Sequence, residues 1–127
     1  MKTPKSQTGW YAKFANAFRG VAVGIRGQSS FNVHFVFGAA VLLAGAVLQI
    51  ADPRQWCLLI LCITIVLSAE LFNSALERLA RAISDQPDTD LGAALDIGSA
   101  AVLLAAIGAA IVGAVIFLAR LGELLGW

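Results

Sequence analysis

Apolar residues fill three long stretches of the chain, and short polar segments separate them. The first stretch runs from Phe35 to Ala51, the second starts at Trp56, and the third is uncharged from Ile97 to Ala119. A continuous apolar segment of about 20 residues is typical of a helix that crosses a membrane. The pattern therefore predicts three transmembrane helices, at about residues 33–51, 56–82 and 94–119.

Two polar segments mark the turns between these helices. In the sequence DPRQ, residues 52–55, Pro53 lacks a backbone N–H donor and disfavours helical geometry in the residue before it. The sequence SDQPDTD, residues 84–90, is acidic and rich in turn-forming residues. We therefore expect a tight loop after the first span and a short acidic loop after the second.

The segment before the first span has a different pattern, because its apolar residues recur at helical spacing. On a helical wheel they fall within about 80° of one another, and Arg19 and Arg26 point the opposite way. They are Trp10, Phe14, Phe18, Val21 and Ile25. This pattern predicts an amphipathic helix at about residues 10–28 that lies in the membrane interface. The helix either only anchors the chain or also walls a site where a lipid headgroup meets a cytosolic substrate.

The composition agrees with a membrane protein. Of the 127 residues, 59% are hydrophobic, and the mean hydropathy is +0.81, which is too apolar for a water-soluble domain of this length. No Pro-, Ser- or Gly-rich linker divides the chain, so we predict one domain over residues 1–127. The predicted fold class is an all-α membrane protein with one interfacial helix and three transmembrane helices. We expect no nucleic-acid partner.

The charges are distributed unevenly along the chain. Basic residues come well before Asp52, which is the first acidic residue. They are Lys2, Lys5, Lys13, Arg19 and Arg26. Arg78 and Arg81 add positive charge after the second apolar stretch. Because basic residues are enriched in cytoplasmic segments of membrane proteins, we predict that the N-terminus is cytoplasmic and that the C-terminus lies on the other side.

Three polar residues share one face of the second span, in the sequence SAELFNSALE at residues 68–77. A helix turns about 100° per residue, so Asn73 lies about 60° and Glu77 about 20° from Glu70 around the axis. Counted from Trp56 at about 1.5 Å per residue, Glu70 is about 21 Å and Glu77 about 31 Å along the helix. In a hydrocarbon layer of about 30 Å, Glu70 is then below the cytoplasmic surface and Glu77 is at it.

A carboxylate inside the membrane costs free energy, and two interpretations explain why Glu70 is there. An ionised side chain at mid-membrane costs about 2.5–3.5 kcal/mol on insertion scales. In the chemical interpretation, Glu70 takes a proton from a hydroxyl, Asn73 orients either partner, and Glu77 binds a hard cation at the water boundary. In the structural interpretation, Glu70 and Asn73 only form hydrogen bonds to neighbouring helices. The residues alone favour neither.

A second polar pair, Asp96 and Ser99, lies where the third apolar stretch begins. The pair could simply cap the start of that helix. Because the loop after the second span is short, however, Asp96 is expected at the same membrane boundary as Glu77. Two carboxylates at one level, beside Arg78 and Arg81, could hold a magnesium ion and nucleotide phosphates.

Small residues recur in the third stretch at spacings of three and four. They are Gly98, Ala101, Ala105, Gly108 or Ala109, and Val112. These residues leave a narrow strip along which another helix can approach closely. Three short spans enclose little protected volume, so a site for a polar substrate needs neighbouring subunits. We therefore expect a homo-oligomer.

Two sequence motifs carry a resemblance to a known family: AELFNSALE at residues 69–77 and DIGSAAVL at residues 96–103. Two further segments agree with them, AFRG at residues 17–20 and SFNVHF at residues 30–35. With its basic interfacial helix, three spans and acidic loop, the chain resembles the small integral-membrane prokaryotic diacylglycerol kinase family, which includes the undecaprenol kinases. The likeness covers nearly the whole chain.

The resemblance implies ATP-dependent phosphorylation of a lipid hydroxyl at the cytoplasmic face of the prokaryotic inner membrane, by a homotrimer whose active sites lie at subunit boundaries. With diacylglycerol as the lipid, the product is phosphatidic acid. By position, Glu70 would be the proton acceptor that meets the lipid, Asn73 a supporting polar group, and Glu77 a ligand of Mg²⁺ and the nucleotide. Asp96 would contact the nucleotide, and Ser99 would line the lipid site.

The chain departs from the family pattern at several positions. Leu95 stands where the family usually has a lysine that meets nucleotide phosphate. Gln28 stands where a second metal-binding glutamate is expected, and Arg81 replaces an acid. Gln28 stays a candidate metal ligand, and Arg19, Arg78 or Arg81 could supply the positive charge that the nucleotide site would otherwise lack.

Three functions remain open at this point. The first is a lipid kinase that phosphorylates diacylglycerol or, as an alternative, undecaprenol. The second is a catalytically weakened relative that binds lipid or assists membrane assembly, which Leu95 and Gln28 motivate. The third is a small multidrug-type transporter in which a buried glutamate carries protons. Three spans rather than four, and a carboxylate cluster at the cytoplasmic side, argue against the transporter.

Overall fold

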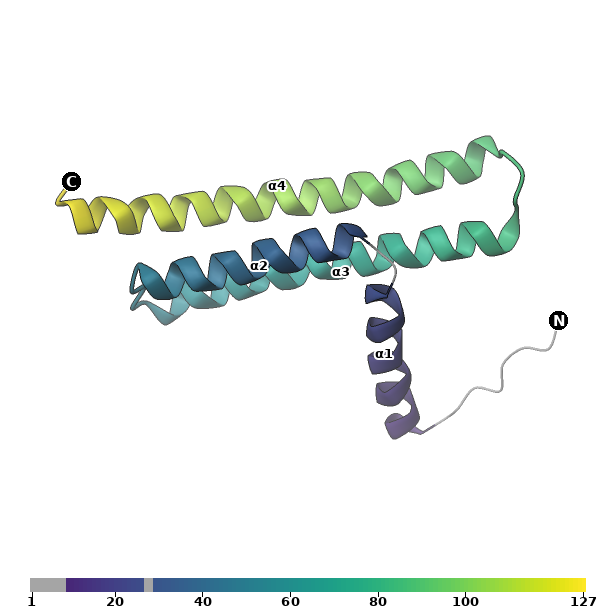
Figure 1. Cartoon of the computed structure of the whole chain (residues 1–127), viewed down its shortest axis with the longest axis horizontal. Coiled ribbons are helices and arrows are strands. Elements are labelled where there is room, and N and C mark those ends of the chain that lie inside the picture. Colours follow the sequence, from purple (N-terminus) through teal and green to yellow (C-terminus); the bar gives the residue numbers. More distant parts are fainter. Residues whose placement is uncertain (1–8, 27–28) are drawn as a thin grey trace.

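A computed structural model describes residues 9–26 and 29–127, and Figure 1 shows the arrangement of its helices. The described residues form four helices and no strand: α1 (Trp10–Ile25), α2 (Ser29–Val47), α3 (Pro53–Ile83) and α4 (Thr89–Leu125). Three of these helices, α2 to α4, are long and apolar enough to cross a membrane. The predicted all-helical fold with three candidate membrane spans is confirmed.

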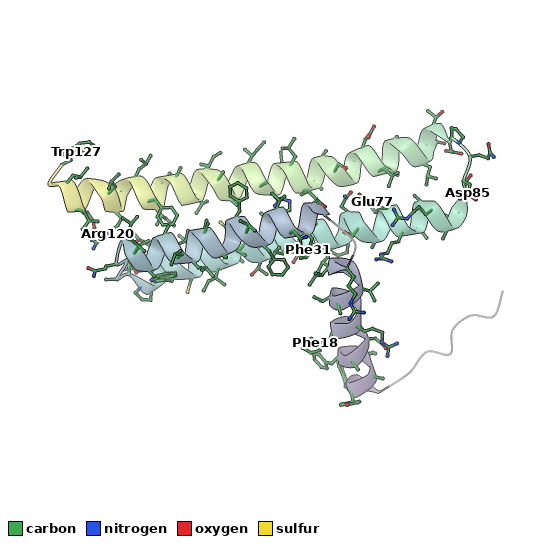
Figure 2. All side chains as sticks on the ribbon, in the orientation of Figure 1. Phe18, Phe31, Glu77, Asp85, Arg120 and Trp127 are labelled. Atoms are coloured by element: carbon green, nitrogen blue, oxygen red, sulfur yellow. The ribbon has the colours of Figure 1, made fainter. Side chains whose placement is uncertain are left out.

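The helices are organised around α3. Helices α2, α3 and α4 run alongside one another, whereas α1 projects steeply away from them (Figure 1). Helix α3 packs most extensively against α4 and also contacts α2 and α1. A small core of Ile50, Leu59 and Ile116 lies near the turn from α2 to α3. Most other large apolar side chains are exposed along the helices (Figure 2), as expected for surfaces that lipid or other subunits cover.

The turn between α2 and α3 ends the first span earlier than the hydropathy predicted. Helix α2 stops at Val47 and not near residue 51. Gln49 takes a left-handed φ of 53°, and the Ile50 N–H donates back to the last turns of α2 at 3.1 Å. The indole N–H of Trp56 then donates to the Ile50 carbonyl at 2.9 Å. Residues 48–51 are largely apolar, which is why hydropathy extends the span to them, but the chain turns back toward α3 within these residues.

Helices α3 and α4 extend beyond their predicted limits because capping, and not hydropathy, sets where they begin and end. The Asp52 carboxylate accepts a hydrogen bond from the Arg54 N–H at 2.9 Å, so α3 begins within the segment expected to be a loop. The Asp88 carboxylate accepts from the Leu91 N–H at 2.9 Å at the start of α4. Gly126, with a φ of 74°, terminates α4. An apolar stretch therefore marks only part of each helix.

Hydrogen bonds join the C-terminal end of α1 to α3. The Arg78 guanidinium donates to the Val23 carbonyl at 2.9 Å and to the Arg26 carbonyl at 3.4 Å. Gly24 is buried at this contact, and a Cβ atom there would lie 2.5 Å from Leu71 Cδ2. The absence of a side chain at Gly24 therefore lets α1 approach α3 where α1 ends.

Helix α4 approaches α3 closely at Gly98, one of the small residues expected to permit tight contact. A Cβ atom at Gly98 would lie 2.6 Å from Asn73 Oδ1 and 3.0 Å from Leu76 Cδ1. We predict that Gly98→Val forces these side chains away and lowers the free energy of unfolding by about 1–3 kcal/mol, the usual cost of overpacking. Thermal unfolding in detergent micelles, followed by circular dichroism, measures the loss.

Gly108→Val is the matched control, because no atom lies within 4 Å of a Cβ at Gly108 on the same helix. The valine has the same intrinsic effect on helix formation at both positions, so only Gly98→Val should lower the unfolding midpoint strongly. An equal loss in both variants would contradict the contact at Gly98 as the cause.

Candidate functional site

Glu70 is buried in the bundle, with 3% of its surface exposed. Two side chains of α2 meet its two carboxylate oxygens. The Ser30 hydroxyl donates a hydrogen bond to Oε1, and His34 Nε2 lies 3.8 Å from Oε2. The first turns of α2 and the middle of α3 therefore form one polar site inside an otherwise apolar bundle.

Asn73 lies one helical turn beyond Glu70 and is also buried. Its Nδ2 donates to Glu77 Oε1 at 3.1 Å, and its Oδ1 points toward α4 at Gly98. Oδ1 has no hydrogen-bond partner among the residues that the structure describes. A buried polar atom left in that state costs about 1–3 kcal/mol. Oδ1 is therefore an unsatisfied acceptor covered by α4 at Gly98.

Glu77 lies where the polar face of α3 reaches the bundle surface, and its side chain is 33% exposed. Arg81 Nη1 is 4.0 Å from Glu77 Oε2. The other arginine expected here, Arg78, is turned toward α1 and donates to two backbone carbonyls. Of the two arginines predicted beside the carboxylates, Arg81 thus lies next to Glu77, whereas Arg78 joins α1 to α3.

Asp96 and Ser99 lie exposed inside α4. Because Asp88 caps this helix and Thr89 begins it, the interpretation of Asp96 and Ser99 as a helix-start cap is wrong. The Ser99 hydroxyl donates to the Leu95 carbonyl, one turn earlier on the same helix, at 3.1 Å. The predicted start of the helix near residue 94 led to that interpretation, since the apolar stretch begins there but the helix does not.

The contact between Gly98 and Asn73 fixes the level of Asp96 relative to Glu77. Helices α3 and α4 run in opposite directions, with the loop at residues 84–88 between them. At about 1.5 Å per residue, Asp96 lies about 3 Å and Glu77 about 6 Å from the contact toward this loop. The two carboxylates are therefore at similar levels on the two helices.

The other candidate ligands lie apart from this site or cannot be placed. Arg19 is exposed on α1, and Gln28 lies outside the described residues. Within residues 9–26 and 29–127, no three His, Cys, Asp or Glu side chains come together to form a metal site. A cation held here would thus need most of its ligands from a bound substrate or from outside this part of the protomer.

Ser30 and His34 are site residues that the sequence did not identify. They lie four positions apart in SFNVHF, residues 30–35, and this spacing puts both on one face of a helix. That spacing was a usable signal, since a serine and the chain's single histidine share a face at the start of a span. Their partner was not readable, because the contact with Glu70 depends on how α2 packs against α3.

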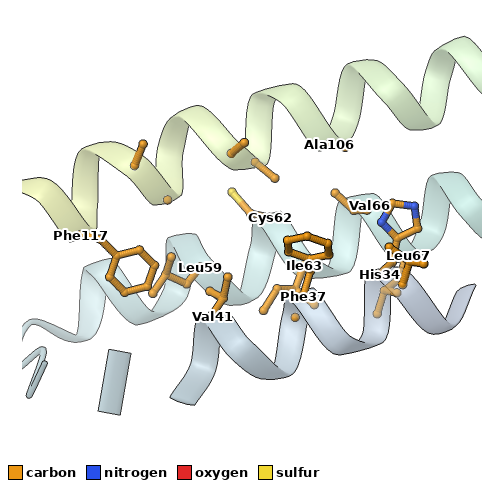
Figure 3. Close-up of a pocket in the computed structure, with 16 residues that line it drawn as sticks. His34, Phe37, Val41, Leu59, Cys62, Ile63, Val66, Leu67, Ala106 and Phe117 are labelled. Carbon is orange, nitrogen blue, oxygen red and sulfur yellow. The ribbon is translucent and has the colours of Figure 1, made fainter. Parts of the chain in front are cut away.

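An apolar cavity of about 420 Å³ lies between α2, α3 and α4 (Figure 3). Its lining is mostly apolar and includes Phe37, Leu59 and Phe117. His34 lies toward one end of the cavity and Phe117 toward the other (Figure 3). Because His34 also faces Glu70, the cavity adjoins the buried carboxylate. A hydrocarbon chain could lie in it with a polar end group near Glu70.

Comparison with known proteins supports the resemblance found in the motifs. The family model for prokaryotic diacylglycerol kinase matches residues 15–117. The chain is 30% identical to the undecaprenol kinase of Bacillus subtilis over 112 residues, which cover 88% of this chain and 90% of that protein. It is 32% identical to the diacylglycerol kinase of Synechocystis sp. over 131 residues, which cover 98% of this chain and 74% of that protein.

Proposed function

We propose that this chain, which belongs to the prokaryotic diacylglycerol kinase family and is a lipid kinase, phosphorylates diacylglycerol to give phosphatidic acid. ATP is the co-substrate that the kinase family implies. The transfer would take place at the cytoplasmic face of the prokaryotic inner membrane. The coarse activity follows from the family, whereas the lipid and the residue roles are the proposal.

One observation carries the proposal: a buried carboxylate, Glu70, accepts a hydrogen bond from the hydroxyl of Ser30 beside an apolar cavity. A general base must lie within hydrogen-bond reach of the proton that it removes. The lipid hydroxyl makes a second contact of this kind with Glu70 and gives up its proton to the carboxylate. Its oxygen attacks the γ-phosphorus, and the bond from phosphorus to the leaving ADP oxygen breaks.

The nucleotide is assigned to the end of the polar face at Glu77. Mg²⁺ is usually bound by one or two carboxylates together with substrate phosphates, and Glu77 would be such a ligand. Asp96 lies at a similar level but about 200° around α4 from Gly98, the residue that faces α3, so it would contact a nucleotide on the outer side of α4. Bound Mg²⁺ would neutralise charge on the phosphate oxygens. Arg81, 4.0 Å from Glu77, and Arg19 would add positive charge. Gln28 stays a candidate metal ligand beyond the described residues.

The remaining polar groups support the reaction by positioning the substrates. Asn73 holds the Glu77 carboxylate through Nδ2. Ser99, exposed on α4, would line the lipid site. Effective catalysis of phosphoryl transfer needs mainly such positioning and charge neutralisation, which a small set of polar side chains can supply.

Undecaprenol is the second candidate lipid. The Bacillus relative is named for that substrate and matches over 90% of its length, whereas the family description and the Synechocystis relative favour diacylglycerol. The cavity of about 420 Å³ is lined by aliphatic and aromatic groups, so it suits an acyl chain or an isoprenoid chain.

The assembly is proposed to be a homotrimer with sites completed between subunits. In support, Asp96 and Ser99 are exposed in the single protomer, as are most large apolar side chains of the helices. We also propose one domain, with a cytoplasmic N-terminus and with α1 in the membrane interface. Phe18, 75% exposed, stands out from α1 (Figure 2), and such a face suits the acyl boundary.

The deciding experiment offers several lipids to the purified protein in nanodiscs with Mg²⁺ and labelled ATP. We expect label in diacylglycerol, with much less in undecaprenol or ceramide, and no transfer when EDTA removes Mg²⁺. Preferential labelling of undecaprenol would replace the proposed substrate with the alternative. Absence of label from every lipid would reject the proposed activity and favour a catalytically weakened, lipid-binding member of the family.

A further inference from the structure

We propose that Ser30 and His34 are positioning residues that hold the Glu70 carboxylate in place for proton transfer. The inference rests on the proposed function, because it takes Glu70 as the proton acceptor. It adds two residues of α2 to a site that the sequence placed on α3 and α4.

Ser30 and His34 each lie against a different oxygen of the Glu70 carboxylate. Oε1 accepts the hydrogen bond from Ser30, and Oε2 faces His34 Nε2 at 3.8 Å. The hydrogen bond to Oε1 and the imidazole beside Oε2 both restrict the rotation of the carboxylate about its terminal bond. An ionised carboxylate offers about four lone-pair positions, so a substrate hydroxyl still finds an acceptor. Ser30 and His34 can therefore orient Glu70 without occupying its whole hydrogen-bonding capacity.

The start of α2 is anchored where these contacts form. Phe31, between Ser30 and His34 in sequence, is 1% exposed, and its ring lies 5.2 Å from that of Phe35. The phenyl group of Phe31 is thus packed inside the protein at the first turn of α2. The contacts of Ser30 and His34 show that the neighbouring face of α2 is directed at Glu70.

The imidazole of His34 also acts electrostatically on the Glu70 carboxylate. Its side chain is 21% exposed, that of Glu70 is 4% exposed, and the imidazole also lines the apolar cavity. At 3.8 Å the separation exceeds a direct hydrogen bond, but the dipole of an N–H at Nε2 still attracts the carboxylate oxygen. An N–H at Nε2 therefore favours the rotamer in which Oε2 faces α2.

The kinetic test compares each truncation with a variant that keeps its polar group. We expect His34→Ala and Ser30→Ala each to lower kcat for lipid phosphorylation about tenfold, within the roughly hundredfold that a 1 Å misplacement can cost. KM for ATP should stay within about twofold. His34→Gln and Ser30→Thr, which retain an N–H and a hydroxyl, should recover most of kcat. Asn32→Ala, an exposed position on α2, is the matched control and should match the wild type.

A second readout does not depend on turnover, because His34 is the single histidine of the chain. In protein labelled with ¹⁵N-histidine and held in nanodiscs, the Nε2 resonance should move in Glu70→Gln and stay in place in Glu77→Gln. An unmoved resonance in Glu70→Gln, or full kcat in both alanine variants, would overturn the inference. If the wild type phosphorylates no lipid, the proposed function fails, whereas a resonance that still moves supports the contact of His34 with Glu70.

Discussion

Replacing Glu70 by glutamine should lower the rate of phosphoryl transfer to lipid by about 10²–10⁴-fold, the range that general acid–base catalysis contributes. Glutamine keeps the length of the side chain, and its carbonyl oxygen can still accept the hydrogen bond from Ser30. Its neutral amide cannot take up the proton of the lipid hydroxyl. Single-turnover transfer from labelled ATP into lipid in nanodiscs measures the change.

The matched control for this substitution is Glu123→Gln. The Glu123 carboxylate lies 2.8 Å from the Arg120 guanidinium on α4, and Arg120 also donates to the Leu48 carbonyl near the opposite end of α2. Removing that charge should leave transfer unchanged. Full activity in Glu70→Gln would instead support the structural interpretation, in which Glu70 only joins α2 to α3.

The sequence was sufficient to predict the three spans because each depends on a local property. A helix that crosses a membrane satisfies its backbone hydrogen bonds internally and exposes apolar side chains, so hydropathy identifies it without reference to other helices. The shared face of Glu70, Asn73 and Glu77 depends only on helical geometry, and the hydrogen bond from Asn73 to Glu77 agrees with it.

The sequence was not sufficient where an outcome depends on packing between helices. Arg78 and Arg81 have the same charge and lie three positions apart. Arg78 nevertheless donates hydrogen bonds to α1, whereas Arg81 lies beside Glu77. The partners of Glu70 come from α2: Ser30 lies 40 positions earlier in the sequence and His34 lies 36 positions earlier. No periodicity along α3 carries that information, since it is set by the way α2 lies against α3.

Helix ends were mispredicted for a related reason. The apolar stretch begins beside Asp96 and predicts a helix start there, but Asp88 caps α4 eight residues earlier. The correction removes the capping role from Asp96. A cap residue would use its carboxylate on its own helix, whereas Asp96 inside α4 is exposed and lies at nearly the level of Glu77.

Leu95→Lys should lower KM for ATP by about 10- to 100-fold. A hydrogen bond to a charged group contributes about 1.5–3 kcal/mol, and each 1.4 kcal/mol is a factor of about ten in affinity. Leu95 is half-buried next to Asp96, about 4.5 Å along α4 from the contact at Gly98 toward the loop, and thus close to the level of Glu77. An ammonium group on a flexible stem there could reach phosphate oxygens. Steady-state kinetics with varied ATP at saturating lipid measure the effect.

Leu95→Met provides the control, because methionine keeps an apolar stem of similar length without adding charge. Its KM for ATP should match the wild type, and KM for lipid should change little in either variant. An unchanged KM for ATP in Leu95→Lys would contradict a phosphate contact at this position, with Arg81 beside Glu77 as the cation already serving the nucleotide. A fall in KM for ATP would instead mean that leucine at position 95 weakens nucleotide binding.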